Sequence, residues 1–324
     1  MLHIHPGSIL LDKLQRAGLP GDRLEWSEVL CQGPTPHGVS DDAWYTMRAR
    51  FLTSAYGPME NRDVRAELLQ QDAALARAGS HDEIVLWFGP ELFCQAILVR
   101  LLARCAELPL AHTRVSLVSV DCYPGVDDHK ACTLGALSGP QLADLFARRA
   151  TTTAPQFALA RRAWEALGAP TPEPLAALVR EDTSALPYLG AALRRLLAEL
   201  PDVTTGLSRT ERLILDALPV ARGLDAFVPA NDPEPRRWMT DAIFFDHVRR
   251  LARTPHALIE IGTNGGTDEL GYAELARTAT GDDVRTGKRD AIALRGIDRW
   301  VGGTHLRADN VWRWDDAKSQ VTRG

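Results

Sequence analysis

Short apolar segments alternate with longer amphipathic segments over the first 120 residues of the chain. Apolar runs between polar turns predict strands at 2–5, 23–30, 83–88 and 114–120, and helical periodicity predicts helices at 9–17, 41–56, 61–78 and 92–102. The two later strand segments are almost entirely apolar, which is typical of parallel strands covered by helices on both faces. We therefore predict a Rossmann-like α/β domain with a mostly parallel sheet at residues 1–132.

The pattern changes after residue 132. Residues 133–200 show helical periodicity interrupted by APTPEP, and we predict an α-helical extension without strands. Residues 201–324 contain a capping box, in which Ser208 precedes Glu211 by three residues. Further helices at 238–251 and 268–281, a strand within HALIEI and two alternating runs in RWVGGTHLRADNVWRWD follow. Helices followed by a two-stranded ribbon resemble a winged helix, so we predict a winged-helix-like α+β domain.

Composition and charge narrow the class of protein. The 324 residues are 45% hydrophobic and 24% charged, which is ordinary for folded domains, and no apolar run approaches the roughly 20 residues that cross a bilayer. The N-terminus has no basic segment followed by an apolar run. The net charge of -5 gives no general attraction for nucleic acid or for an anionic membrane. We expect a cytoplasmic protein without a membrane partner.

The cysteines predict neither a disulfide framework nor a zinc site. They are five in number and include no C-x-x-C pair. Two of them, Cys94 and Cys105, fall within an apolar helical pattern, where a thiol behaves as a small hydrophobic group. We therefore expect buried or chemically inert thiols.

The loops after parallel strands are where a Rossmann-like sheet binds its ligands. Gly7 and Ser8 follow the first strand and open a helix, so their N–H groups could bind a phosphate or a carboxylate. The loop lacks the further glycines or the lysine of known phosphate-binding loops, so a simple turn is the alternative. Glu91 and Gln95 share one helix face after the third strand, where Glu91 could meet the ligand or only favour the helix dipole. Residues 121–129 add carboxylates after the fourth strand.

Three more candidate binding residues surround the loop after the second strand. They are Trp26, Gly33 and Arg48. Arg48 could hold an anion through two parallel hydrogen bonds, and Trp26 could supply a stacking face. The alternative is an arginine on a helix surface and a tryptophan in the core.

Two histidines lie on one side of the first predicted strand. His3 and His5 are two residues apart, but no third ligand is nearby in the sequence, so we predict a partly buried pair and no metal site. His3 or Glu91 could act as a general acid or base. The chain contains no G-x-S-x-G, H-E-x-x-H or kinase motif and indicates no particular cofactor, so whether it is an enzyme stays open.

Arginines are frequent in the C-terminal region. Six could contact phosphates: Arg209, Arg212, Arg295, Arg299, Arg307 and Arg313. Acidic residues are about as frequent there, whereas a DNA-binding domain is normally clearly basic. A nucleic-acid partner is therefore not favoured by charge.

Several segments together resemble an uncharacterised bacterial family, domain of unknown function 1835. They are HIHPG, EWSEVLCQGPTP, RARFL, IVLWFGPELFCQ, LPYLGAALRRLLAELP, GLSRTERLILDAL, RWVGGTHL and WRWD, and they span nearly the whole chain. The resemblance implies no activity. The first turn of the family usually has Gly-Asp-Ser where this chain has Gly7, Ser8 and Ile9, and a Glu-His-Asp segment reads Gly89-Pro90-Glu91 here. The chain thus departs from the family at its carboxylates.

These patterns support three functional hypotheses. The first is a protein that binds a nucleotide-like or phosphorylated small molecule at the carboxyl edge of the sheet, with the C-terminal domain as an interaction element. The second is a hydrolase or transferase that acts at the same edge. The third is a ligand-responsive DNA-binding regulator. The ligand and the oligomeric state are not determined by the sequence.

Overall fold

The N-terminal half of the protein is built on a five-stranded sheet. The computed structural model describes residues 1–56, 62–110, 112–126, 133–236, 238–262 and 270–324. The strand order is β2-β1-β3-β4-β5, and the strands are β1 (Leu2–His5), β2 (Asp22–Glu25), β3 (Glu83–Trp87), β4 (Arg114–Val118) and β5 (Ala150–Thr151). All pairs are parallel except β4 with β5. The predicted α/β class with a mostly parallel sheet is confirmed.

Two details of the predicted strands are wrong. β2 ends at Glu25 instead of residue 30, because the backbone pairing with β1 stops where Trp26 N–H donates to His5 O and the chain then turns into the core. β5 lies within the segment 133–200, where no strand was expected. It has only two residues, both exposed, and so is too short to show an apolar alternation.

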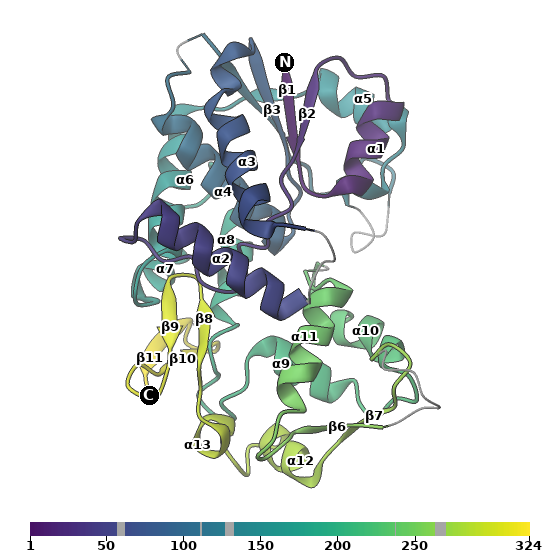
Figure 1. The fold of residues 1–324 in the computed structure, drawn as a ribbon, viewed down its shortest axis with the longest axis vertical. Coiled ribbons are helices and arrows are strands. Elements are labelled where there is room, and N and C mark those ends of the chain that lie inside the picture. The colour runs from purple at the N-terminus through teal and green to yellow at the C-terminus, as the bar shows by residue number, and fades with distance from the viewer. Residues whose placement is uncertain (57–61, 111, 127–132, 237, 263–269) are drawn as a thin grey trace.

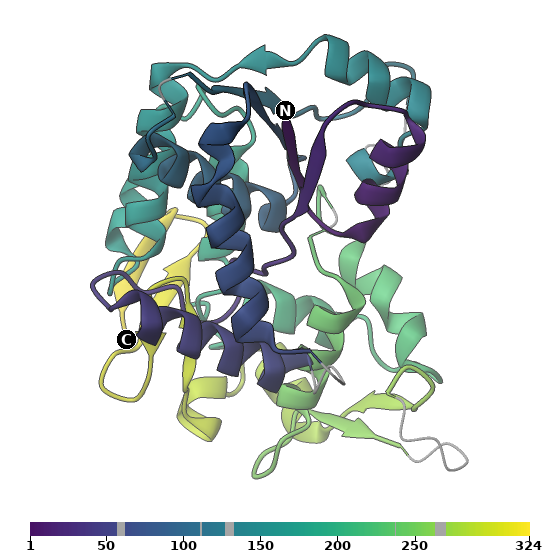
Figure 2. The same cartoon turned by 45° about the horizontal axis from the view of Figure 1, so that its top comes forward.

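Helices cover both faces of the sheet (Figure 1). On one face lie α1 (Ser8–Arg16) and α5 (Gly139–Ala147), whose leucines pack against Val85 and Trp87 of β3. On the other face lie α3 (Val64–Ala76), α4 (Leu92–Glu107) and α6 (Ala154–Leu167). Figure 2 shows the same two layers from a tilted direction. Because both faces are covered, β3 is buried along its whole length, as its apolar sequence predicts.

The strand order creates a switch point between β1 and β3. The chain leaves β1 through α1 on one face of the sheet and leaves β3 through α4 on the other. Register pairs Leu2 with Ile84, so the two strands end at the same edge. In sheets of this kind the loops diverge at that point and leave a crevice. The predicted turn residues and Glu91 lie at this edge.

The remaining elements form a helical layer and a C-terminal region. α2 (Asp41–Tyr56) begins after Ser40, whose Oγ accepts a hydrogen bond from Ala43 N–H, and α8 (Leu189–Leu197) packs against α4. The others are η1 (Ala78–Ser80), η2 (Leu134–Ala136), α7 (Glu173–Leu178), α9 (Arg209–Asp216), α10 (Gly223–Asn231), α11 (Asp241–Leu251), β6 (Ile259–Ile261), β7 (Leu275–Arg277), α12 (Ala279–Arg285), α13 (Ala291–Arg295), β8 (Arg299–Val301), β9 (Thr304–Leu306), β10 (Trp312–Asp315) and β11 (Gln320–Arg323).

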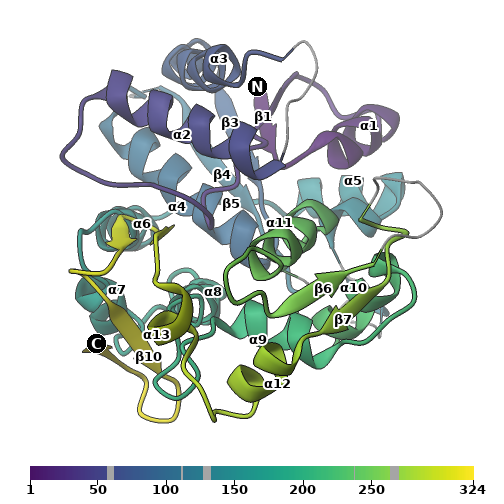
Figure 3. The same ribbon diagram turned by 60° about the horizontal axis from the view of Figure 1, so that its bottom comes forward.

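The C-terminal region separates into two groups of elements (Figure 3). One contains α9–α12 with the β6–β7 hairpin, and the other contains α13 with the β8–β9 and β10–β11 hairpins. The predicted capping box of α9 is confirmed. The helix expected at 268–281 is wrong, because residues 275–277 pair with β6 and Thr278 caps a new helix. The two runs expected to pair within 299–315 instead belong to separate hairpins.

Three further predictions concern the cysteines, membrane-spanning segments and the carboxylates after the fourth strand. Cys122 is disulfide-bonded, so the expectation of thiols is wrong there, whereas Cys31, Cys94 and Cys105 are free and buried. Within the described residues, no helix is long and apolar enough to span a membrane. Carboxylates predicted at residues 127–129 lie outside the described residues.

Candidate functional site

A buried arginine shapes the loop between β2 and α2. Arg48 of α2 is fully buried, and its guanidinium donates to Glu28 Oε1 at 3.0 Å and to the carbonyl oxygens of Val29 at 2.8 Å and Gln32 at 2.6 Å. A guanidinium has five N–H donors, and the protein itself uses most of them here. The prediction that Arg48 clamps an anionic ligand is therefore not supported. Arg48 instead fixes the loop that carries Gln32 and Gly33.

Gly33 lets this loop approach α2 closely. Its φ is +71°, and a Cβ built on it would lie 2.3 Å from Phe51 Cδ1. We expect Gly33→Ala to lower the free energy of unfolding by about 2–3 kcal/mol, because left-handed strain adds to the overlap with the ring. Urea denaturation measures this.

Gly38 in the same loop provides the matched control for this substitution. Its φ is +78°, but no atom lies within 4 Å of a Cβ placed there. Gly38→Ala should therefore cost only the backbone strain, about 1 kcal/mol. Equal costs at the two positions would show that the contact between the loop and Phe51 is unimportant.

The β8–β9 hairpin is held against this loop by backbone contacts. Gly303 N–H donates to Leu167 O at 2.7 Å, and Thr35 N–H donates to Gly302 O at 3.0 Å. A Cβ on Gly302 would lie 2.3 Å from Leu167 O, so glycine is required for this approach. These contacts place Arg299 and Trp300 of β8 beside the loop.

Helix α11 supplies the opposite wall. Asp246, His247 and Arg250 recur at spacings of three and four residues and so share one side of the helix, and Arg253 follows two residues after its end. α11 packs against α2 and α9. This side of α11 therefore faces the loop and the β8 strand.

Two adjoining cavities lie between these walls. The first, of about 220 Å³, is lined by Gln32, Gly33 and Phe51 on one side and by Asp246 and His247 on the other. The second, of about 530 Å³, lies between α11 and α13. Four side chains line both: Arg250, Arg253, Asp298 and Arg299. We call the two cavities together the arginine cleft.

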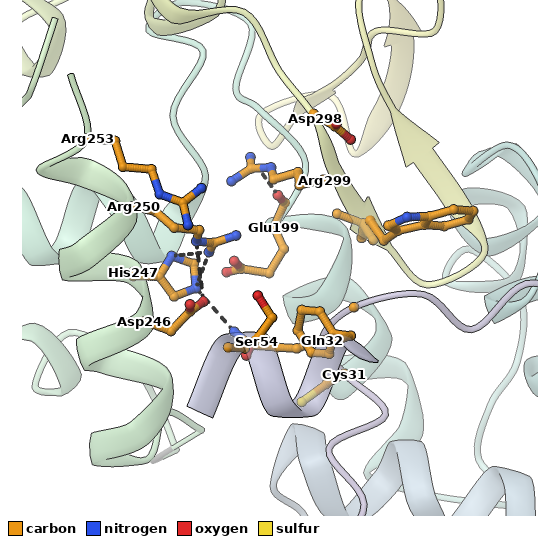
Figure 4. Close-up of a pocket in the computed structure, with 15 residues that line it drawn as sticks. Cys31, Gln32, Ser54, Glu199, Asp246, His247, Arg250, Arg253, Asp298 and Arg299 are labelled. Atoms are coloured by element: carbon orange, nitrogen blue, oxygen red, sulfur yellow. Dashed lines mark hydrogen bonds and ion pairs between the residues drawn. The ribbon is translucent and has the colours of Figure 1, made fainter. Parts of the chain in front are cut away.

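Figure 4 shows how the side chains of the first cavity are directed. Arg250 of α11 and Arg253, which follows that helix, extend toward Arg299, which comes from the facing wall. Arg299 donates to Glu211 Oε1 at 2.9 Å and to Glu199 O at 3.1 Å. Arg253 is exposed, and its guanidinium makes no hydrogen bond or ion pair with any residue that the structure describes. Its guanidinium is therefore available to a ligand.

Hydrogen-bond donors outnumber acceptors around His247. Its Nδ1 lies 2.8 Å from Arg250 Nη2, and its Nε2 lies 3.2 Å from Gln32 Nε2. Gln32 Oε1 accepts from the Tyr56 hydroxyl, which leaves the amide NH₂ facing the imidazole. Burial lowers the pKa of His247 well below its usual range, and Arg250 lowers it further, so the ring is neutral and has only one acceptor nitrogen. This surplus of donors suits a ligand rich in acceptors.

Burial and charge act against each other on two of the carboxylates that line the cleft, Asp246 and Glu211. Burial raises the pKa of Asp246, against the opposing effect of Arg250. Burial also acts to raise the pKa of Glu211, but Arg299 and Arg250 outweigh it and the pKa falls. Glu211 is therefore a fixed countercharge to the arginines, whereas Asp246 is the carboxylate that gains a proton more easily.

No protein-family model and no curated protein matches this chain. Its function is therefore inferred from its own geometry.

The structure places the predicted site residues in three different settings. Among the predicted site residues of the N-terminal domain, all of which the structure describes, Gly33 alone lines the arginine cleft. Gly7 and Ser8 lie at the N-terminus of α1, where Ser8 is exposed and no side chain caps the helix. Glu91 is the buried N-cap residue of α4, and burial raises its pKa. Gln95 is also buried and donates to Gly89 O at 2.7 Å.

Two further candidates, the aromatic Trp26 and the imidazole of His3, are buried in the core. Trp26 is 1% exposed, and the guanidinium of Arg100 lies 5.6 Å from its ring, so no stacking face is open to a ligand. His3 accepts a hydrogen bond from Trp87 Nε1 at 3.0 Å and donates through Nε2 to Pro20 O at 2.9 Å. Since both ring nitrogens are occupied, the acid–base role proposed for His3 is not supported. No cluster of three metal-ligating side chains occurs in the described part of the chain.

Sequence reasoning missed two of the cleft arginines. Arg299 and Arg295 were named as phosphate contacts, but Arg250 and Arg253 were not. The segment DHVRRLAR contains the only local indication, because its charged residues recur with helical spacing. Nothing in that segment alone shows that it faces β8.

Proposed function

We propose that this protein binds a nucleotide-like or phosphorylated small molecule in the arginine cleft. The observation that carries the proposal is the set of convergent arginines, of which Arg253 has a guanidinium without a partner within the described residues. Guanidinium groups bind phosphate and carboxylate oxygens through charge-assisted hydrogen bonds. The surplus of donors at His247 supports the same class of ligand. We therefore place the proposed binding site in the arginine cleft, whereas the sequence predicts it at the β1–β3 edge.

Loss of Arg253 tests this proposal. Isothermal titration calorimetry in low salt with nucleoside mono- and diphosphates should give binding that weakens roughly fivefold in Arg253→Ala, since one partly exposed contact to an anion contributes about 1 kcal/mol. Arg249→Ala is the matched control, because Arg249 is exposed on the same helix but lines neither cavity. Equal losses in both variants would indicate a general charge effect. Absence of binding to all the nucleotides would contradict the proposal.

We further propose that α9–α11 and the β6–β7 hairpin form a winged-helix-like unit that acts within the molecule. Val220, between α9 and α10, exchanges backbone hydrogen bonds of 2.9 and 3.0 Å with Leu275 of β7. The resulting order of helix, strand, two helices and hairpin is that of a winged helix. Its third helix, α11, packs against α2 and lines the cleft. The surface of this helix is therefore covered by other parts of the same chain.

DNA binding provides the test of this intramolecular role. We expect fluorescence anisotropy to show no salt-dependent binding to duplex DNA at micromolar protein. A DNA affinity that falls steeply with salt would instead favour the DNA-binding regulator.

We also propose membership of the family domain of unknown function 1835. The segments quoted from the sequence are what supports this, and two of them have structural roles: RARFL supplies Arg48, which holds the CQGP segment, and VGGTHL supplies the glycine pair that packs on the end of α6. The proposal adds no activity to the cleft.

A further inference from the structure

We propose that the ligand of the arginine cleft is a nucleoside carrying two or more phosphate groups, with its phosphates in the second cavity and its nucleoside in the first. This inference rests on the proposed function and specifies the ligand and its orientation. Three properties of the two cavities carry it: their charge, their size and the position of their aromatic side chains.

The charged side chains differ between the cavities. Three arginines and three carboxylates line the first cavity, whereas four arginines and two carboxylates line the second. The additional arginine of the second cavity is Arg295, and the carboxylate found there in place of Glu199 and Asp246 is Glu211. An excess of positive charge therefore exists only in the second cavity, and the anionic end of a ligand is stabilised there.

Crowding of the arginines strengthens this preference. Burial lowers the pKa of Arg295, and Arg253, Arg250 and Arg299 lower it further, against the opposing effect of Glu211. Arg295 donates to Arg250 O at 2.5 Å, which holds its guanidinium near those of α11. Several like charges at close range are relieved by a ligand with more than one negative group, so a polyphosphate is favoured over a single phosphate.

Aromatic side chains are confined to the first cavity. Phe51 and Trp300 line it, and among the residues that the structure describes no aromatic side chain lines the second. Trp300 is stacked on His305 with ring centroids 4.3 Å apart and an interplanar angle of 11°, so it can present its opposite face or its edge to a ligand. Stacking on aromatic rings is how proteins hold bases without reading their hydrogen-bond pattern.

Polar groups of the first cavity suit a sugar. Asp246 and Ser54 line it beside Gln32. Within the described part of the chain Asp246 has a single ion pair, a contact of 3.3 Å with Arg250, so its carboxylate keeps capacity to accept hydrogen bonds from ribose hydroxyls. The net charge of zero in this cavity is consistent with an uncharged nucleoside.

Size requires that one ligand use both cavities. The first cavity, at about 220 Å³, is smaller than the roughly 300–1,000 Å³ of typical small-molecule sites. Arg250, Arg253 and Arg299 line both cavities and so lie at their junction. A linear ligand would place its first phosphate among these three guanidiniums and the next beside Arg295.

Three variants and four probes test this orientation. Calorimetry first selects the diphosphate that binds most tightly among ADP, GDP, CDP and UDP, and the other probes are its monophosphate, its nucleoside and inorganic pyrophosphate. Arg295→Gln should weaken binding of the diphosphate and of pyrophosphate at least fivefold and leave the nucleoside unchanged. Trp300→Leu should weaken the diphosphate and the nucleoside at least fivefold and leave pyrophosphate unchanged. Arg295→Lys, which keeps the charge, should retain most of the pyrophosphate affinity.

The outcomes separate this inference from the proposed function. The orientation is overturned if a diphosphate binds but Arg295→Gln weakens the nucleoside and Trp300→Leu weakens pyrophosphate, or if both variants weaken all probes alike. In either case the proposed function still stands. A monophosphate that binds as tightly as its diphosphate overturns the polyphosphate assignment. Absence of binding to every probe overturns the proposed function, and the inference with it. Melting temperatures of the variants within a few degrees of the parent protein exclude misfolding as the cause.

Discussion

Replacing Glu28 with glutamine is expected to lower the free energy of unfolding by about 3–5 kcal/mol. The Glu28 side chain is fully buried and accepts hydrogen bonds from Arg48 and Arg100, which are 0% and 7% exposed in their side chains. Its charge offsets the cost of burying those two guanidinium groups, with Asp72 as a second countercharge to Arg100. A neutral amide leaves one positive charge uncompensated in the core. Urea unfolding of the two proteins measures the difference.

An exposed pair of the same chemical type is the control for Glu28. Glu67 pairs with Arg62, and their side chains are 34% and 46% exposed. Glu67→Gln should therefore change the free energy of unfolding by at most about 1 kcal/mol. A Glu28→Gln variant as stable as Glu67→Gln would show that water reaches the buried network. If the prediction holds, the variant should also lose ligand affinity, because Arg48 positions the loop that carries Gln32 and Gly33.

The sheet could be predicted because its strands carry their own pattern. β3 and β4 are apolar and separated by helices with an apolar face, and such segments have few alternatives to a covered parallel sheet. β2 was predicted too long, because the side chains after Glu25 are alternately buried without being paired in the sheet. That burial depends on Arg48, which lies more than 20 residues further along the chain.

The site was predicted less well, because it depends on contacts between distant segments. The arginine cleft joins residues 31–33, 51–55, 246–253 and 298–301, and no one of these segments contains a motif for ligand binding. The pairing of buried charges also cannot be predicted from a single sequence. The helical pattern alone predicts Arg48 on a helix surface, and only the structure shows that Glu28 and the loop carbonyls surround it. The β1–β3 edge could be named from topology alone, but topology does not show which edge of the molecule is lined by unpaired donors.

Acidification is expected to destabilise the protein through His5, by roughly 2 kcal/mol at pH 4.5 relative to pH 7.5. His5 is fully buried. Its pKa is lowered from 6.5 to about 4, chiefly by burial and also by His3 and Arg23, against a hydrogen bond to Gly7 O at 3.2 Å that raises it. Between these two pKa values the unfolded chain binds a proton that the folded protein does not. The stabilising contribution is therefore complete above about pH 6.5 and is lost as the pH falls toward 4.

Other groups titrate in the same range, so the measurement must isolate His5. Burial raises the pKa of Glu91 and of Asp246, and a carboxyl whose pKa is raised on folding adds stability as the pH falls, opposite in sign to His5.

Urea unfolding at pH 7.5, 6.5, 5.5 and 4.5 should therefore compare the parent protein with His5→Asn, whose amide can still donate to Gly7 O. The carboxyl contributions cancel in the difference between the two curves. Each pH unit over which only the unfolded chain is protonated lowers the free energy of unfolding by about 1.4 kcal/mol. The free energy of unfolding of the parent protein minus that of His5→Asn should therefore fall by roughly 2 kcal/mol from pH 7.5 to 4.5. Parallel curves would show that His5 accepts a proton in the folded protein as readily as in the unfolded chain, which a buried imidazole nitrogen without a partner cannot do.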